Sequence, residues 1–130
     1  MAAIALTYHE LPLILPASEP AARVALAARR QGGYDVLHAR LQRSNFVPSE
    51  AYIRDLAIGA GLDEERLIFD MNHPDVDAAL ARSRGLAARF RFVGTPAMVI
   101  GRTAVLGALD AAALDDLIEI EASEPPVCTA

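Results

Sequence analysis

The chain has 130 residues, of which 53% are hydrophobic, a formal net charge of −5 and a single cysteine. This length predicts one domain that buries roughly two thirds of its unfolded surface. The negative charge argues against a nucleic-acid partner, because phosphate binding requires a basic stripe.

The chain begins with an apolar segment that we interpret as a buried strand over residues 4–8. The segment carries Glu10 and Pro12 and has no basic residue before it, whereas a signal peptide starts with a charged region. Proline cannot donate to a strand ladder, so we expect the strand to end near Pro12. No apolar run approaches the ~20 residues that span a bilayer. We therefore expect a soluble, cytoplasmic chain without a membrane partner.

Five helices are predicted next. Ser18 is a good N-cap for the first, and Asp63 for the fourth. Glycines at 32 and 61 stop the first and third helices. The inward face of the fifth helix includes Val76, Leu80 and Phe90. The expected helices cover residues 18–30, 34–41, 48–60, 63–71 and 72–90.

The last third of the chain predicts two strands and one helix. A Gly94-Thr95-Pro96 turn runs into an apolar strand that starts at Ala97, and a second strand covers residues 103–106. The final helix is expected over residues 110–121, and a flexible tail over 122–130. So few strands do not make a stable sheet unaided.

This order of elements resembles the DsbA-like family of thioredoxin-fold disulfide oxidoreductases. The likeness rests on Val93-Gly94-Thr95-Pro96, on Gly61-Leu62-Asp63, and on residues 10–16, 21–41 and 107–117, so it covers nearly the whole chain. It implies an α/β, truncated thioredoxin-like fold with a small mixed sheet. The domain would cover residues 1–121, with a helical insertion at about 18–91.

Relative to this family, the N-terminal strands and the Cys-x-x-Cys pair are missing from the chain. In a thioredoxin sheet the missing second strand lies between the strand at Ile4 and the strand at Ala97. Its absence leaves unpaired sheet edges, which invite pairing with another chain. We expect a homodimer with exchanged or abutting strands, or else a direct new pairing within one chain.

The resemblance also implies a peptide-binding site at Gly94, Thr95 and Pro96. In related proteins the corresponding peptide bond before proline is cis, and the preceding residue offers its backbone to an extended substrate strand. The alternative is that the bond only makes a structural turn, a common use of cis proline.

Cys128 is the only thiol of the chain and therefore the only candidate nucleophile. Acidic residues at 121 and 124 lie near it, a setting that disfavours the thiolate. We expect an incidental thiol of the tail, or an intermolecular disulfide. The histidines at 9, 38 and 73 lack metal-ligand spacing, so no metal or cofactor is expected. His38 lies on an apolar helix face, which favours a hydrogen-bonded core histidine.

These observations predict a non-catalytic binding or assembly module without a redox cysteine pair of its own. It would have no catalytic residues, and its partners would be a second copy and a peptide or protein. The alternatives are a thiol–disulfide oxidoreductase represented by an N-terminally truncated chain, which would be periplasmic, or a glutathione-using relative. A disulfide-exchange cycle requires a second cysteine unless a partner supplies it.

Overall fold

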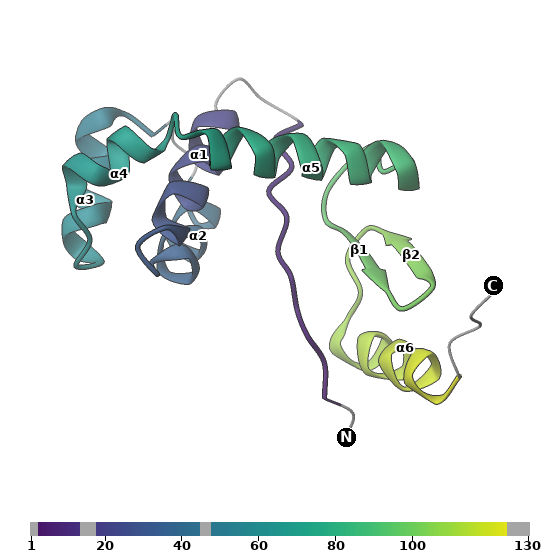
Figure 1. Cartoon of the computed structure of the whole chain (residues 1–130). Coiled ribbons are helices and arrows are strands. Elements are labelled where there is room, and N and C mark those ends of the chain that lie inside the picture. The colour runs from purple at the N-terminus through teal and green to yellow at the C-terminus, as the bar shows by residue number, and fades with distance from the viewer. Residues whose placement is uncertain (1–2, 14–17, 45–47, 125–130) are drawn as a thin grey trace. The chain divides into compact units, whose positions relative to one another are not determined.

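The computed structural model of the chain describes residues 3–13, 18–44 and 48–124. Backbone contacts divide the chain into two compact units. We call His9–Leu86 the helical unit, and Met1–Tyr8 with Ala87–Ala130 the hairpin unit. The described residues form α1 (Ser18–Arg29), α2 (Tyr34–Gln42), α3 (Glu50–Gly59), α4 (Glu64–Asp70), α5 (Pro74–Phe90), β1 (Ala97–Ile100), β2 (Thr103–Leu106) and α6 (Ala111–Ser123), as Figure 1 shows.

Local sequence signals set the ends of several helices. Ser49 accepts a hydrogen bond from the Tyr52 amide at the start of α3, and Asp63 accepts one from the Arg66 amide at the start of α4. After α1, the chain turns at Gly32, whose φ of +76° lies in the left-handed region that favours glycine. The five expected helices are therefore confirmed, although Ser18, the expected N-cap, is already part of α1.

α1 is the central helix of the helical unit, because it is buried on two faces. One face packs into a core with the other helices of the N-terminal half. The opposite face, with Ala22 and Leu26, packs against Val76 and Leu80 of α5. Both faces contain alanines, and small side chains let helices approach closely. The first core consists of Val24, Ala27, Ala28, Leu37, Ile53, Leu56, Ala57 and Leu67.

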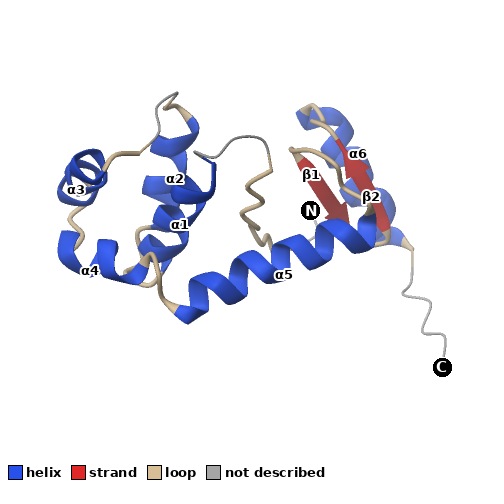
Figure 2. Ribbon diagram, turned by 90° about the horizontal axis from the view of Figure 1, so that it is seen from above, coloured by secondary structure: helices blue, strands red, loops and turns tan. Residues whose placement is uncertain are grey.

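The hairpin unit is built on an antiparallel pair of strands and one helix. β1 and β2 pair in a register that runs from Ala97 opposite Leu106 to Ile100 opposite Thr103. Asp110 caps α6 by accepting a hydrogen bond from the Ala113 amide. α6 contacts β1, and its residues Leu114, Leu117 and Ile118 are half-buried. Figure 2 shows the two strands in red beside α6.

The strand expected over residues 4–8 is not formed. Ile4 is 63% exposed and Leu6 69% exposed, and the sheet of the described residues contains only β1 and β2. An extended segment becomes a strand only when its backbone groups are paired. The α/β fold class is confirmed, but the sheet is an antiparallel hairpin, smaller than the mixed sheet we expected.

Two smaller expectations at the ends of helices are also corrected. Phe90 is 38% exposed instead of inward; its ring stacks on that of Phe92. α6 continues to Ser123, so the start of the expected tail is helical. The rest of that tail, residues 125–130, lies outside the described residues.

Candidate functional site

The loop of Gly94, Thr95 and Pro96 leads directly into β1. Thr95 and Pro96 are exposed and Gly94 is half-buried, and the Thr95–Pro96 peptide bond is cis. The Pro96 carbonyl accepts a hydrogen bond of 2.8 Å from the Gly107 amide. This bond ties the loop to the residue that follows β2, so the loop is held in place while its backbone stays accessible.

β1 has one paired edge and one free edge. Because the Pro96 carbonyl faces β2, and hydrogen-bonded residues alternate along an antiparallel strand, Met98 and Ile100 direct their backbone groups toward β2. Ala97 and Val99 direct theirs toward the other edge. No strand pairs with that edge among residues 3–13, 18–44 and 48–124. Within the same ranges no backbone hydrogen bond of Ala97 or Val99 is found outside the hairpin, so two main-chain donors and two acceptors are available beside the loop.

Glu121 of α6 holds the turn between the two strands. Its Oε2 accepts the Arg102 amide proton at 3.0 Å, and its Oε1 accepts the Thr103 hydroxyl at 2.5 Å. The Thr103 hydroxyl, followed by the Arg102 amide, lowers the pKa of Glu121 below its usual 4.5. Arg102 also forms an ion pair with Glu124. α6 therefore holds the hairpin at the turn between β1 and β2. These contacts of Glu121 do not involve the free edge of β1.

A cluster of titratable side chains lies in the helical unit. The Tyr34 hydroxyl donates to Glu10 at 2.6 Å, and His38 Nδ1 lies 2.7 Å from the same carboxylate oxygen. Arg29 lies over the Tyr34 ring, 4.3 Å from its centroid. Burial, and then the hydrogen bond to Glu10, raise the pKa of Tyr34 far above its usual value.

His38 is hydrogen-bonded as expected, through its contact with Glu10, but it is half-buried instead of part of the core. The sequence did not indicate the rest of this cluster. The spacing of Tyr34 and His38 places their rings on one helix face, and they stack at 5.1 Å. Glu10 comes from a loop 24 residues earlier than Tyr34, and no local pattern marks it. The cluster joins that loop to α2.

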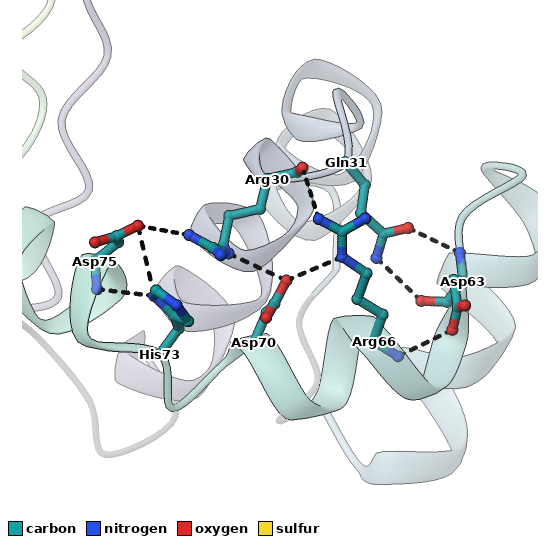
Figure 3. A network of polar contacts seen from close by, with 7 residues as sticks. All are labelled: Arg30, Gln31, Asp63, Arg66, Asp70, His73 and Asp75. Carbon is teal, nitrogen blue, oxygen red and sulfur yellow. Dashed lines mark hydrogen bonds and ion pairs between the residues drawn. The ribbon is translucent and has the colours of Figure 1, made fainter.

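A second polar network joins the turn after α1 to α4 and α5, as Figure 3 shows. Asp70 is 4% exposed, and its Oδ2 lies 3.1 Å from Arg30 Nε and 3.5 Å from Arg66 Nε. Arg30 also reaches Asp75 at 2.5 Å. The Arg30–Asp70 contact is an ion pair whose alignment does not make a regular hydrogen bond. Since Asp70 faces two guanidinium groups, it acts as a structural anchor between helices.

The remaining candidates from the sequence are the other histidines and Cys128. No group of three or more His, Cys, Asp or Glu residues in the described part of the chain could hold a metal ion. His73 makes helix-start contacts with Asp75. Cys128 lies outside the described residues. None of the helices in the described ranges is both long and apolar enough to cross a membrane.

Comparisons with known proteins place this geometry among thioredoxin-like folds. The family model of the DSBA-like thioredoxin domain matches residues 2–119. A thioredoxin-like oxidoreductase from Silicibacter pomeroyi DSS-3 is 36% identical, with a TM-score of 0.82; the match covers 91% of this chain and 68% of that one. ScsC from Proteus mirabilis, in a compact conformation, is 24% identical with a TM-score of 0.73, and the match covers 88% and 64%. The latter likeness shows the fold alone. No curated protein matches the chain.

We predict that Tyr34→Phe lowers the free energy of unfolding by about 1–3 kcal/mol, because a buried hydrogen bond to a carboxylate is lost. Tyr52→Phe is the matched control, since no hydrogen bond of the Tyr52 hydroxyl is found within the described part. Urea unfolding followed by circular dichroism measures both. Equal effects of the two variants would contradict a stabilising role for the Glu10–Tyr34 contact.

We predict that Glu121 makes the stability of the chain depend on acid pH. Its folded-state pKa is lowered, so its contribution is complete above the unfolded value near 4.5 and is lost as the pH falls through the folded value. Thermal melting between neutral and acid pH should show a smaller loss of stability for Glu121→Gln than for the unmodified chain. Glu119→Gln, on the exposed side of α6, is the control and should behave like the unmodified chain.

Proposed function

Because the chain belongs to the DSBA-like thioredoxin domain family, we propose that it is a binding module for extended peptide segments, without thiol chemistry of its own. The observation that carries this proposal is the free edge of β1 next to the accessible Gly94-Thr95-Pro96 loop. An extended peptide can add to such an edge as a further strand.

The free edge offers main-chain hydrogen bonds from Ala97 and Val99, two residues apart. A peptide strand hydrogen-bonds to every second residue of its neighbour, so this spacing suits an antiparallel or a parallel addition. Val99 is 45% exposed and gives the peptide an apolar side chain to pack against. Affinity that comes from the main chain is tolerant of sequence. The proposed partners are therefore unfolded or extended segments rather than one defined sequence.

The absence of thiol chemistry is inferred from the cysteine count. Disulfide exchange requires an attacking thiolate and a second sulfur that resolves the mixed disulfide. Cys128 is the only cysteine in the chain. A catalytic cycle by this chain alone therefore lacks a resolving partner.

The alternative function is thiol–disulfide exchange with a cysteine pair supplied by a partner or by a longer polypeptide. The 36% identity to a thioredoxin-like oxidoreductase favours it, as does the match to only 68% of that chain. A glutathione-using reaction is a variant of this alternative, in which the peptide thiol comes from the substrate. An insulin-reduction assay with glutathione separates the glutathione-using variant from the binding module: the module gives no acceleration over glutathione alone, whereas a glutathione-using enzyme does.

We further propose that a second copy of the chain occupies the same edge when no peptide is bound. An unpaired strand edge is a template for association, and closed symmetric dimers are the commonest way to satisfy it. The peptide and the second copy would then compete for Ala97 and Val99. Peptide binding would shift the protein from homodimer to monomer.

We predict that Val99→Pro weakens peptide binding about tenfold, because it removes one edge donor and leaves a peptide carbonyl unpaired. Edge positions tolerate proline, so the hairpin itself should persist. Fluorescence anisotropy with a labelled, cysteine-free peptide of alternating valine and threonine measures the affinity. Val99→Thr keeps the amide and is the matched control. Equal affinities of the proline and threonine variants would refute edge binding.

We predict a homodimer of the 13.9 kDa chain whose mass, measured by light scattering, is the same with and without reductant. Cys128→Ser should not change this mass, and Val99→Pro should increase the monomer fraction. A chain that is monomeric at all concentrations would exclude the dimer. A dimer that dissociates on reduction would assign the association to Cys128 instead.

A further inference from the structure

A pocket of about 240 Å³ lies in the helical unit, between the C-terminal end of α1 and the first half of α5. Leu26 of α1 and Val76 and Ala79 of α5 line it with apolar side chains. Leu26 and Val76 belong to the core between these helices. The pocket is partly open to solvent, so a small ligand would be seated in it with one side exposed.

Charged residues line the rest of this pocket: Arg29, Arg30, Arg82 and Asp75. The chain has 12 cationic side chains and a net charge of −5. Three of those cationic side chains line this pocket, together with one acidic side chain. Guanidinium groups bind carboxylates with two parallel hydrogen bonds. The local charge is positive where the chain as a whole is negative.

The three arginines differ in how they are held. The Arg29 guanidinium lies over the Tyr34 ring, and Arg30 is fixed between Asp70 and Asp75, as Figure 3 shows for Arg30 and its two acids. No hydrogen bond or ion pair of Arg82 is found within the described residues. Arg82 is exposed and is thus available to an anion.

We propose that this pocket binds a small organic carboxylate. The carboxylate group would contact Arg82 and Arg30, and a short apolar body would cover Leu26, Val76 and Ala79. The pocket combines an apolar floor with guanidinium groups, which are the side chains that bind carboxylates in pairs of hydrogen bonds. The proposal is independent of the peptide site, because it uses only residues of the helical unit.

Asp75 would compete with a ligand carboxylate for Arg30. Its carboxylate lies 2.5 Å from Arg30 Nη1 and its side chain is 71% exposed, so it occupies the position that a ligand carboxylate would take on Arg30. An exposed ion pair contributes little stability and can be exchanged for a ligand. Removal of the Asp75 charge should therefore favour binding, whereas removal of the Arg82 charge should oppose it.

Titration of the isotope-labelled chain with N-acetyl-leucine, followed by NMR, tests the proposal. The amide signals of Leu26, Val76 and Ala79 should shift and saturate. N-acetyl-leucinamide, which has the same apolar body without the charge, should give no saturable shift. Binding of 3-methylbutanoate as well would indicate free small acids as the source of the ligand. Binding of N-acetyl-leucine only would indicate the C-terminus of a peptide. Failure of both acids to bind, or equal binding of the amide, overturns the proposal.

Three variants test the proposal further, and two of them are expected to change the affinity in opposite directions. Arg82→Gln should weaken binding about fivefold, and Asp75→Asn should tighten it. Arg89→Gln is the matched control, because Arg89 is exposed on the same helix but does not line the pocket. If Arg89→Gln weakens binding as much as Arg82→Gln does, the effect is one of net charge and the pocket is not the site. Weaker binding by Asp75→Asn would also contradict the proposal.

Discussion

The double-sided burial of α1 is the constraint on which the helical unit depends. An amphipathic helix normally buries one stripe, whereas α1 buries Val24 and Ala27 on one face and Leu26 on the other. Alanine makes this arrangement feasible, because helices on both sides can approach the same short segment. The two faces end at Arg29, the last residue of α1, which is exposed, and at Arg30 just after it, which is half-buried.

The hairpin unit differs from the helical unit, because one edge of β1 has no partner strand in the described ranges. Antiparallel pairing satisfies the groups of Met98 and Ile100, whereas those of Ala97 and Val99 face an edge without a partner strand in the described ranges. Apolar side chains near this edge are exposed as well, among them Val99. Membership of the DSBA-like thioredoxin domain family gives this edge its significance, because that fold normally continues the sheet.

The sequence predicted the features that depend on residues close to one another in the chain. The cap at Asp63 and the helix that follows it were placed correctly, because the cap and the amide that donates to it lie within one turn. Residues 4–8 carry a local strand pattern, but pairing is a non-local event and did not occur. Glu10 and Tyr34 are likewise 24 residues apart, so no periodic pattern in the sequence indicates their contact. The loop at Thr95 could be predicted from the sequence. The pocket beside Arg82 could not, because it forms only where α1 packs on α5.

The division of the chain at Leu86 has a consequence for synthesis on the ribosome. The helical unit is continuous in sequence, and the hairpin unit combines both ends of the chain. At 5–20 residues per second, the ribosome needs about 2 to 9 s to add the residues after Leu86. Helical domains with local contacts fold within about a millisecond or faster. The helical unit therefore has time to fold before Thr103 and Glu121 exist to hold the hairpin. The segment that carries Ile4 and Leu6 belongs to the hairpin unit, so during this interval it has not yet met the rest of its unit.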